Sequence, residues 1–385
     1  MKKILSLLAF TLMLGACEKA ETYEEVDNDF MHNFDVAWNI VNENYCFLGY
    51  KNIDWDKVYD EYKPRVESAK DEFEFFDIMC DLVDIFRDGH SGIISNFDRH
   101  GGDYTIGPNG ESYPKDYISS SVVENYLLKR RVTKNKFVYG IIEQGERKFA
   151  YIGYPDFSVS LGDVDLQYIA PFVDEADGLI VDIRNNPGGV GGYGLLFAGH
   201  FFSEKTLVGY TARKNGVGHD DFTDLYEVKV EPASANNWSD KPTMLLTNRV
   251  VYSTANILAS ALRYAPNVTL VGGRSGGGGG LPEIYYLPNG WAFALPSNVI
   301  FDVEKQHIEN GVEPDVEIHI SDEDADNEKD TILEKAIELL DSCISETDGN
   351  YAFVCDKCAS VFGYYGYFFY QKELERRSKK IYERS

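Results

Sequence analysis

The sequence predicts an α/β fold in which a mostly parallel sheet is flanked by helices and preceded by an N-terminal helical domain. Two observations support this prediction. Beyond the first third of the chain, short apolar runs of β type alternate with helical stretches, a pattern typical of parallel sheets. Near the N-terminus, aromatic and aliphatic residues recur at helical spacing instead. Hydrophobic residues make up 44% of the 385, enough for a packed core.

The helical domain is expected over residues 28–95. One amphipathic run places Phe30, Phe34 and Trp38 at one-turn intervals, and a second such run starts at Phe75. A further helix is expected between them. These segments therefore predict a small bundle that precedes the sheet.

The sheet and its helices are expected further along the chain. Short apolar runs predict strands at 148–154, 178–183, 243–247 and 268–272. The stretches between them predict helices around 163–175, 192–202 and 255–264. A later stretch, 290–302, suggests an additional hairpin.

Changes of composition divide the chain into six parts. They are a leader (1–17), a polar tether (18–27), the helical domain (28–95), a loop-rich insert (96–147), the α/β domain (148–320) and a C-terminal part (321–385). The last part is an acidic linker, an amphipathic helix and an aromatic tail.

The leader, MKKILSLLAFTLMLGAC, has the form of a targeting segment. Lys2 and Lys3 precede an apolar run that is shorter than the roughly 20 residues needed to span a bilayer. The ending LGAC resembles the lipobox of bacterial lipoproteins, in which the cysteine is acylated. This resemblance implies a protein of the bacterial cell envelope, on its periplasmic or surface side, held by lipid on Cys17. An ordinary signal peptide with an incidental Cys17 is the alternative.

Charge excludes two classes of partner. The formal net charge is −26, so the surface repels the phosphates of nucleic acids. The same charge disfavours binding to anionic lipid headgroups. Membrane contact is therefore expected only through the N-terminal lipid.

A glycine-rich turn follows the predicted strand at 178–183, in the string LIVDIRNNPGGVGG. Glycines let backbone N–H groups face a ligand without an intervening side chain. The Lys-Ser/Thr pair of a phosphate-binding loop is absent, and no GxGxxG opens the next helix. An exposed group of N–H donors can also form half of an oxyanion hole.

Ser253, in VVYSTANILASAL, lies where a predicted strand ends and a helix begins. Such a serine is exposed, and the helix N-terminus stabilises developing negative charge. The alternative is that Ser253 only caps the helix, as many serines do.

The string DIRNNPGG closely resembles the hallmark of the S41 serine peptidases, the family of C-terminal processing proteases and the tricorn core protease. FRDGHSG, VVYSTANILASAL and IENGVEPDVEI are similar to other landmarks of that family and follow in the expected order. The resemblance spans about residues 29–320. It implies a ClpP/crotonase-like core, and a catalytic domain over 148–320.

In the processing-protease branch a lysine from a loop resembling GKG is the base. The corresponding loop here is GGRSGGGGG, and Gly278 falls about where the lysine would be. Arg274 is no substitute, because a guanidinium group stays protonated. A Ser–Lys dyad is therefore excluded in this loop.

The tricorn-like branch uses a histidine and a late glutamate, which match His90 and Glu309. The resemblance implies that Ser253 is the nucleophile, that His90 takes its proton, and that Glu309 accepts the other ring N–H of His90. Glu313 is an alternative to Glu309, and His307 lies close enough in sequence to compete for a role. A structural histidine in a turn is the alternative for His90.

The oxyanion would be held by backbone N–H groups. The N–H of Thr254, directly after the nucleophile, would act together with that of Gly188 or Gly189. The glycine run 276–280 would form a flexible flap or, alternatively, a solvent-exposed loop.

Many family members carry a PDZ domain between the helical entry and the catalytic layers. The insert at 96–147 has only about fifty residues, against the ~80–100 expected of such a domain. A reduced or absent PDZ domain puts recognition of substrate C-termini in doubt.

The cysteines point to no cofactor. Cys355 and Cys358 form a CxxC in the aromatic tail, where a local disulfide is expected; neither a redox domain nor a four-ligand zinc site surrounds them. No metal or organic cofactor is therefore expected. A thiol oxidoreductase centred on these two cysteines is a remote alternative.

Together these observations predict a lipid-anchored serine endopeptidase that cleaves extracytoplasmic protein or peptide substrates. The alternative is a catalytically inactive S41-like lipoprotein that binds peptides or small ligands. Reaction of Ser253 with a fluorophosphonate discriminates between them.

Overall fold

The computed structural model describes residues 29–103, 114, 116 and 120–345. Three of the sequence predictions lie outside these residues: the leader with Cys17, the Cys355–Cys358 disulfide and the aromatic tail. Among the described cysteines, Cys46 and Cys80 are free thiols, and Cys343 is disulfide-bonded.

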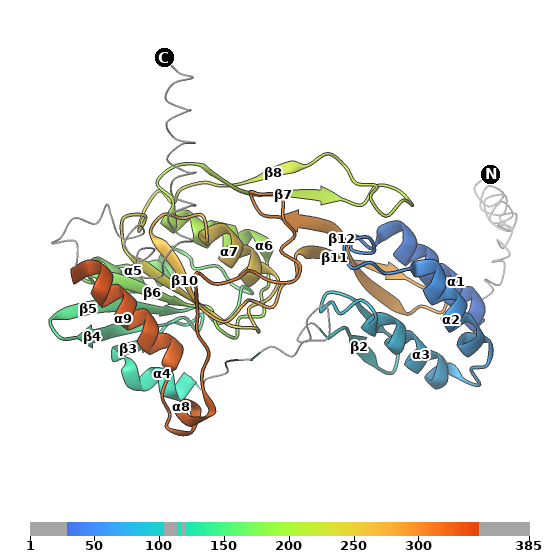
Figure 1. Ribbon diagram of the computed structural model, residues 1–385, viewed down its shortest axis with the longest axis horizontal. Coiled ribbons are helices and arrows are strands. Elements are labelled where there is room, and N and C mark those ends of the chain that lie inside the picture. The colour runs from blue at the N-terminus through green and yellow to red at the C-terminus, as the bar shows by residue number, and fades with distance from the viewer. Residues whose placement is uncertain (1–28, 104–113, 115, 117–119, 346–385) are drawn as a thin grey trace, which may run out of the picture.

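Three helices open the described chain, as predicted: α1 (Phe30–Asn44), α2 (Trp55–Glu67) and α3 (Glu72–Asp84). Each begins after an aspartate whose side chain accepts backbone N–H groups of the first turn: Asp29, Asp54 and Asp71. Their inward faces form one core with a strand from late in the chain, which contributes Phe293 and Leu295. These three helices, called the helical entry below, are therefore packed onto the rest of the protein (Figure 1).

The main sheet has seven strands in the order β13-β10-β9-β6-β5-β4-β3. Their bounds are β3 (Leu128–Val132), β4 (Val138–Gln144), β5 (Arg147–Gly153), β6 (Gly178–Asp182), β9 (Thr243–Thr247), β10 (Val268–Gly272) and β13 (Val316–Glu317). Pairing is parallel from β13 to β5 and antiparallel for β4 and β3. The four predicted strands are present, and the mostly parallel sheet is confirmed.

The predicted loop-rich insert is more regular than expected, because its second half forms β3 and β4. Strand β4 pairs with β5 along its full length, and its central residues, including Ile141 and Ile142, are buried. Helix α4 (Ser120–Tyr126) precedes this hairpin. Residues 128–144 thus extend the main sheet.

A second, antiparallel sheet lies beside the helical entry. Its strands run β2-β1-β12-β7-β8, with β11 on the other side of β12. Their bounds are β1 (Gly92–Ile94), β2 (Arg99–Gly101), β7 (Thr206–Arg213), β8 (Tyr226–Val230), β11 (Gly280–Tyr286) and β12 (Ala292–Phe301). Strand β12 lies in the suggested hairpin at 290–302, and β2 lies at the start of the predicted insert, whose sequence is that of a loop or a weak hairpin. This sheet links the helical entry to the main sheet (Figure 1).

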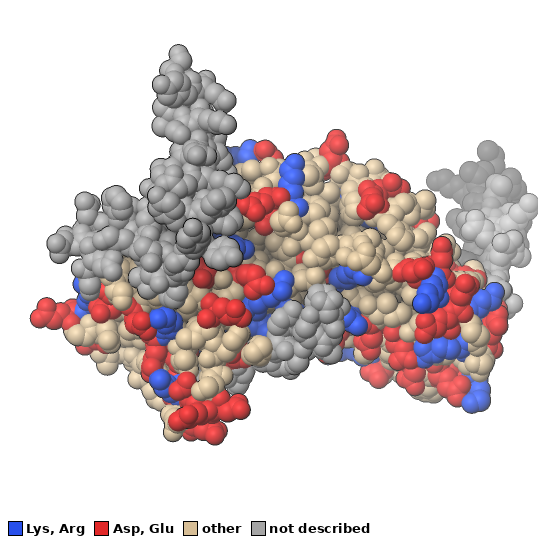
Figure 2. All heavy atoms as spheres, in the orientation of Figure 1, with Lys and Arg blue, Asp and Glu red and all other residues tan. Residues whose placement is uncertain are grey.

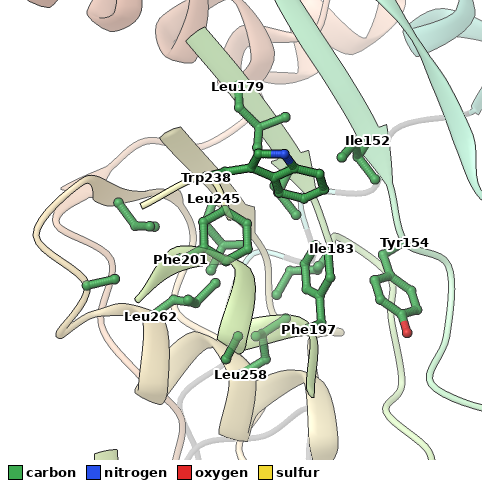
Figure 3. Packing of buried hydrophobic residues seen from close by; sticks show 14 of the residues in the cluster. Ile152, Tyr154, Leu179, Ile183, Phe197, Phe201, Trp238, Leu245, Leu258 and Leu262 are labelled. Carbon is green, nitrogen blue, oxygen red and sulfur yellow. The ribbon is translucent and has the colours of Figure 1, made fainter. Parts of the chain in front are cut away.

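Helices cover both faces of the main sheet. On one face lie α5 (Asp163–Asp174), α6 (Gly191–Ala198) and α7 (Thr254–Leu262). A short 3-10 helix, η1 (Gly199–Phe201), directly follows α6. On the other lie α4 and α9 (Thr331–Ser345), preceded by the short α8 (Asp322–Asp326). Figure 3 shows Phe197, Leu258 and Leu262 packed toward Leu179 and Leu245 of the sheet. The predicted flanking of the sheet by helices is therefore confirmed.

None of the helices in the described ranges is both long and apolar enough to cross a membrane.

Candidate active site

Ser253 occupies a strained turn between β9 and α7. Its backbone has φ 54° and ψ −121°, a conformation that is costly for a residue with a side chain and that is typical of functional sites. The Ser253 N–H donates to the Gly277 carbonyl at 2.9 Å. Its side chain makes no capping hydrogen bond to α7, so the helix-cap alternative is wrong.

His90 comes from the loop between α3 and β1. Its Nε2 lies 2.9 Å from Ser253 Oγ, although the two residues are 163 positions apart in sequence. This distance allows a hydrogen bond in which the serine hydroxyl donates to a neutral imidazole. The structure thus brings together the two residues on which the predicted chemistry depends.

Asp88, which the sequence reasoning missed, fixes the His90 loop. One of its carboxylate oxygens accepts the His90 backbone N–H at 2.9 Å and the Tyr252 hydroxyl at 3.2 Å. The other accepts the Tyr45 hydroxyl at 3.1 Å. Asp88 is fully buried, and its bond to the N–H two residues on is a local Asx turn. The signal in the sequence was the aspartate two positions before the histidine.

The surroundings of His90 keep its imidazole neutral. Burial lowers the pKa of His90, and this effect outweighs the opposing influence of Asp88. Nδ1 is buried and makes no hydrogen bond of normal geometry with the described residues. A neutral imidazole at pH 7 can accept a proton at Nε2.

Glu309 is at the site but not in the predicted contact. Its Oε1 accepts from Lys51 Nζ at 2.7 Å, and its Oε2 accepts the Gly279 N–H at 2.8 Å. The expected direct bond from the second ring nitrogen of His90 is therefore not present. The physical reason is Lys51, a cation that draws the carboxylate to itself.

The alternatives to Glu309 and His90 lie elsewhere. Glu313 is more than half exposed and pairs with Arg274 at 3.1 Å. His307 stacks on the Tyr50 ring at 4.0 Å, and burial lowers its pKa to about 4. Neither residue makes a described contact with the Ser253 hydroxyl.

Lys51 is a second residue that the sequence reasoning missed. It lies between α1 and α2, and its Nζ contacts Glu309 at 2.7 Å, the Phe86 carbonyl at 2.9 Å and Asp88 at 3.8 Å. Burial alone would lower the pKa of Lys51, but Glu309 and Asp88 outweigh it and raise the pKa. Burial raises the pKa of Glu309 to about 7, and Lys51 opposes that rise. No local motif marks this lysine.

The glycine turn after β6 lies directly against the nucleophile. A Cβ on Gly188 would come within 2.8 Å of Ser253 Cβ and 2.9 Å of the Thr254 nitrogen. The Gly188 N–H already donates to Asn186 Oδ1 at 2.8 Å, so it is used within the turn. The Thr254 hydroxyl donates to the Gly189 carbonyl at 2.7 Å and joins the turn to α7. The Gly188 N–H is therefore not free to donate to an oxyanion, unlike what the sequence allowed.

The glycine run 276–280 is buried and bonded, so the flexible flap and the exposed loop are both wrong. Gly276 donates to the Val251 carbonyl at 2.7 Å, and Gly278 donates to the Glu309 carbonyl at 3.1 Å. At Gly278, with φ 79°, a Cβ would come within 2.7 Å of the Tyr252 ring and 3.0 Å of the Ser253 nitrogen. A lysine does not fit at this position.

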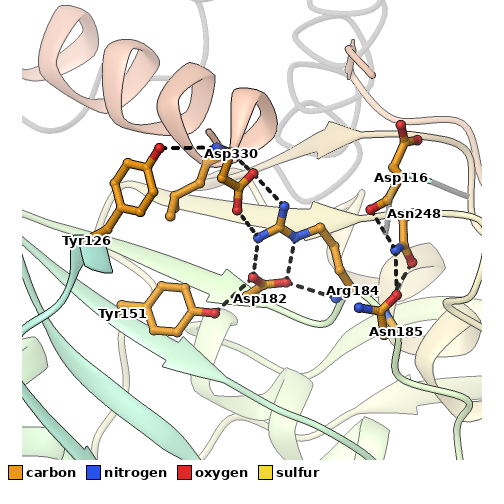
Figure 4. Close-up of polar contacts among 9 residues, drawn as sticks. Asp116, Tyr126, Tyr151, Asp182, Arg184, Asn185, Asn248 and Asp330 are labelled. Atoms are coloured by element: carbon orange, nitrogen blue, oxygen red, sulfur yellow. Dashed lines mark hydrogen bonds and ion pairs between the residues drawn. The ribbon is translucent and has the colours of Figure 1, made fainter. Parts of the chain in front are cut away.

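A buried ionic cluster holds the strand that leads into the glycine turn (Figure 4). Arg184 donates to both carboxylates of Asp182 and Asp330, at distances from 2.6 to 3.0 Å. Tyr151 donates to Asp182 at 2.9 Å. The cluster joins the end of β6 to the start of α9, and none of its members contacts Ser253 or His90.

No group of three or more His, Cys, Asp or Glu side chains within the described ranges has the arrangement of a metal site.

Comparisons with known proteins point to one family. Residues 148–318 match the family model of peptidase family S41, and residues 26–84 match that of the tricorn protease C1 domain. A carboxyl-terminal-processing protease of Synechocystis sp. is 34% identical over 120 residues, which are 31% of this chain and 26% of that protein. The tricorn protease of Thermoplasma volcanium is 23% identical over 397 residues, covering 82% of this chain and 36% of that protein. The chain thus spans about a quarter to a third of these two curated relatives.

Two solved structures share the fold over most of both chains. The crystal structure of a candidate peptidase from Parabacteroides merdae has a TM-score of 0.75 at 36% identity and covers 82% of this chain and 97% of that one. Mature CPAF has a TM-score of 0.66 at 11% identity and covers 84% and 98%. Because the Parabacteroides merdae protein is 36% identical and 97% of its chain is covered, and because residues 148–318 match the family model, the chain belongs to peptidase family S41.

Proposed function

We propose that this protein is a serine endopeptidase that cleaves protein or peptide substrates outside the cytoplasm. The single observation that carries the proposal is the 2.9 Å contact between His90 Nε2 and Ser253 Oγ. Two features of the site add support: the strained backbone of Ser253, and the hydroxyl turned toward the imidazole rather than toward α7.

In the proposed reaction, Ser253 Oγ attacks the carbonyl carbon of the scissile peptide bond while His90 Nε2 takes its proton. The backbone N–H groups of Gly189 and Thr254 stabilise the oxyanion. His90 then gives the proton to the leaving amine, and an acyl-enzyme remains on Ser253. Water, activated by the same imidazole, hydrolyses that ester and restores the serine.

Glu309 supports the imidazole electrostatically in this scheme. When His90 gains a proton, a buried carboxylate can stabilise the imidazolium without a direct hydrogen bond, as Asp88 does by raising the pKa of His90. The buried position of Glu309 strengthens this effect, because water screens it little. Glu309 makes no hydrogen bond with His90 in the structure, so its place as the third member of a Ser-His-Glu triad is part of this proposal.

A polypeptide substrate is supported by the names of the relatives, which are proteases. The short insert argues against a complete PDZ domain and therefore against recognition of substrate C-termini. The contact between a neutral imidazole and the hydroxyl of a strained serine favours catalysis over binding alone.

The proposal is tested by hydrolysis of an unfolded protein such as reduced casein. Ser253→Ala and His90→Ala are each expected to abolish cleavage and to leave the circular dichroism spectrum unchanged. Ser260→Ala, in the same helix but away from the site, serves as the matched control and is expected to cleave normally. Near-wild-type cleavage by either site variant would show that the triad assignment is wrong.

For the location, we propose that lipid on Cys17 holds the protein in the bacterial cell envelope. The lipobox-like sequence LGAC and the polar tether after it support this proposal.

A further inference from the structure

Lys51 is the cation that connects the two loops of the site. Its ammonium group donates hydrogen bonds to Glu309 and to the Phe86 carbonyl, and it forms an ion pair with Asp88 at 3.8 Å. Phe86 and Asp88 belong to the loop that carries His90, whereas Glu309 lies 258 residues from Lys51 in sequence, in the loop after β12. The side chain of Lys51 is 11% exposed, and those of Asp88 and Glu309 are 0% and 3% exposed. A lysine buried to this degree is uncommon and is usually paired.

We propose that Lys51 is a positioning residue of this active site, which holds the His90 loop and the Glu309 loop together through its ammonium group. This inference rests on the proposed function. Lys51 itself does not touch Ser253 in the structure, so it acts through the groups that it binds.

Two partners of Lys51 lead to the catalytic pair, Asp88 by a direct bond and Glu309 through the glycine run. Glu309 accepts the Gly279 N–H, and two residues earlier in the same run the Gly277 carbonyl accepts the Ser253 N–H. Asp88 accepts the His90 N–H. One cation is thus linked to both halves of the pair, by one route through the glycine run and another through the histidine loop.

Charge gives the ammonium group a second role. Glu309 is faced by two charged groups, Lys51 and Asp88, and by the hydroxyl or thiol groups of Tyr45, Cys46 and Tyr50. Burial raises the pKa of Tyr45 and of Cys46 well above the ordinary values, so both stay neutral. Without Lys51, two buried carboxylates would face each other with no cation acting on them, and one would take up a proton.

The direction of the pH effect follows. The pKa of Glu309 is about 7 with Lys51 in place, because burial raises it and Lys51 opposes the rise. Removal of the ammonium group raises this pKa further. Glu309 is then protonated over more of the neutral range. Lys51 also lowers the pKa of His90, so without the ammonium group the imidazole stays protonated to a higher pH. Both effects move the labelling of Ser253 to higher pH.

The test measures the rate at which a fluorophosphonate labels Ser253 between pH 5 and pH 9. In Lys51→Met, the pH at which labelling reaches half its maximum is expected to rise by one unit or more. At a pH below both midpoints, Lys51→Met is therefore labelled about tenfold more slowly than the wild type for each pH unit by which its midpoint is shifted. At pH 9 the labelling rate of the variant partly recovers. Lys51→Arg keeps the charge and is expected to keep the wild-type midpoint. Lys329→Met removes an exposed paired lysine as a matched control and changes nothing.

A purely structural role would lower the labelling rate of Lys51→Met at every pH and leave its midpoint in place. That result, in a variant with wild-type circular dichroism, would overturn the inference. If Lys51→Met does not fold, the double variant Lys51→Met/Glu309→Gln removes both buried charges, a change that proteins often tolerate. In this double variant the pH of half-maximal labelling is expected to depend only on the titration of His90 and to be lower than in the wild type. A value at or above that of the wild type contradicts the inference.

The test separates this inference from the proposed function. If the folded wild type does not react at any pH, the proposed peptidase function fails. If the wild type reacts and the midpoint of Lys51→Met does not move, only the role of Lys51 fails.

Discussion

At the scale of single residues, the backbone around Ser253 decides which catalytic base this site can use. Gly278 has no room for a side chain, because Tyr252 and the Ser253 nitrogen lie against it. The lysine of the processing-protease branch is therefore excluded by packing as well as by sequence. The base has to come from another part of the chain, and His90 is within hydrogen-bonding distance.

Substitution of two glycines separates packing from backbone strain. Gly278 and Gly290 both have positive φ, 79° and 85°, but a Cβ on Gly290 meets nothing within 4 Å. Gly290→Ala is expected to lower the free energy of unfolding by about 1 kcal/mol and to leave fluorophosphonate labelling unchanged. Gly278→Ala is expected to lower the free energy more and to slow labelling at least tenfold, since Tyr252 and Ser253 must move. Denaturant unfolding and labelling rates check both variants; equal labelling by the two would contradict the packing argument.

The sequence could predict Ser253 from its place between a strand and a helix, and the resemblance to the S41 family implied its role and that of His90. Lys51 could not be predicted in this way. Its partner Glu309 is 258 residues away, and nothing in its local sequence distinguishes it from an exposed lysine. Only the folded chain shows that this cation is buried, and the same cation explains why the expected contact between Glu309 and His90 is absent.

At the scale of elements, helix α9 and strand β6 are joined through buried charge. Arg184 at the end of β6 is paired with Asp182 and with Asp330, the residue before α9. All three side chains are nearly or fully inaccessible to solvent. Asp330 also accepts the Leu333 N–H in the first turn of α9 at 3.0 Å. The glycine turn that faces the nucleophile follows directly after this anchor.

Removal of one charge from the cluster is therefore expected to be costly. Asp330→Ala leaves the buried Arg184 with a single carboxylate and is expected to lower the free energy of unfolding by about 3–5 kcal/mol. Asp326→Ala, at an exposed aspartate in α8, is the matched control and is expected to change it by less than about 0.5 kcal/mol. Thermal and denaturant unfolding measure both. Equal stability of the two variants would show that the cluster contributes nothing to the docking of α9.

The elements themselves were predictable to different degrees. Strands β6 and β9 are buried on both faces, so their sequences are continuous apolar runs. Strand β3, LKRRV, is exposed along its whole length, and β1 and β2 have three residues each. Their pairing partners, not their own composition, make these segments strands. For this reason β3 of the main sheet and β1 of the second sheet were missed, whereas β12 lies in a hairpin that the sequence suggests.

At the scale of the whole molecule, the site lies where three parts of the chain meet. The helical entry and the loop after it supply Lys51 and His90, the turn between β9 and α7 supplies Ser253, and the loop after β12 supplies Glu309. Acidic side chains, interspersed with basic ones, cover much of the face shown in Figure 2, including the region of the helical entry. This distribution agrees with the net charge of −26.

The proposed lipid anchor makes a prediction about the whole protein. When the full chain is expressed in a bacterial host fed with radiolabelled palmitate, the label is expected in the protein and the protein in the membrane fraction. Cys17→Ala is expected to remove the label and to release the protein from that fraction. Cys80→Ala, at a free cysteine in α3, is the control and is expected to keep both. Labelled Cys17→Ala protein would contradict the assignment.

The most direct test of the account is to react the folded protein with a fluorophosphonate at pH 8 and to locate the adduct by peptide mass spectrometry. The account predicts one adduct, on Ser253, which is absent from Ser253→Ala and strongly reduced in His90→Ala. A wild-type protein with intact circular dichroism that stays unmodified, or an adduct on a different residue, would contradict the claim that His90 activates Ser253.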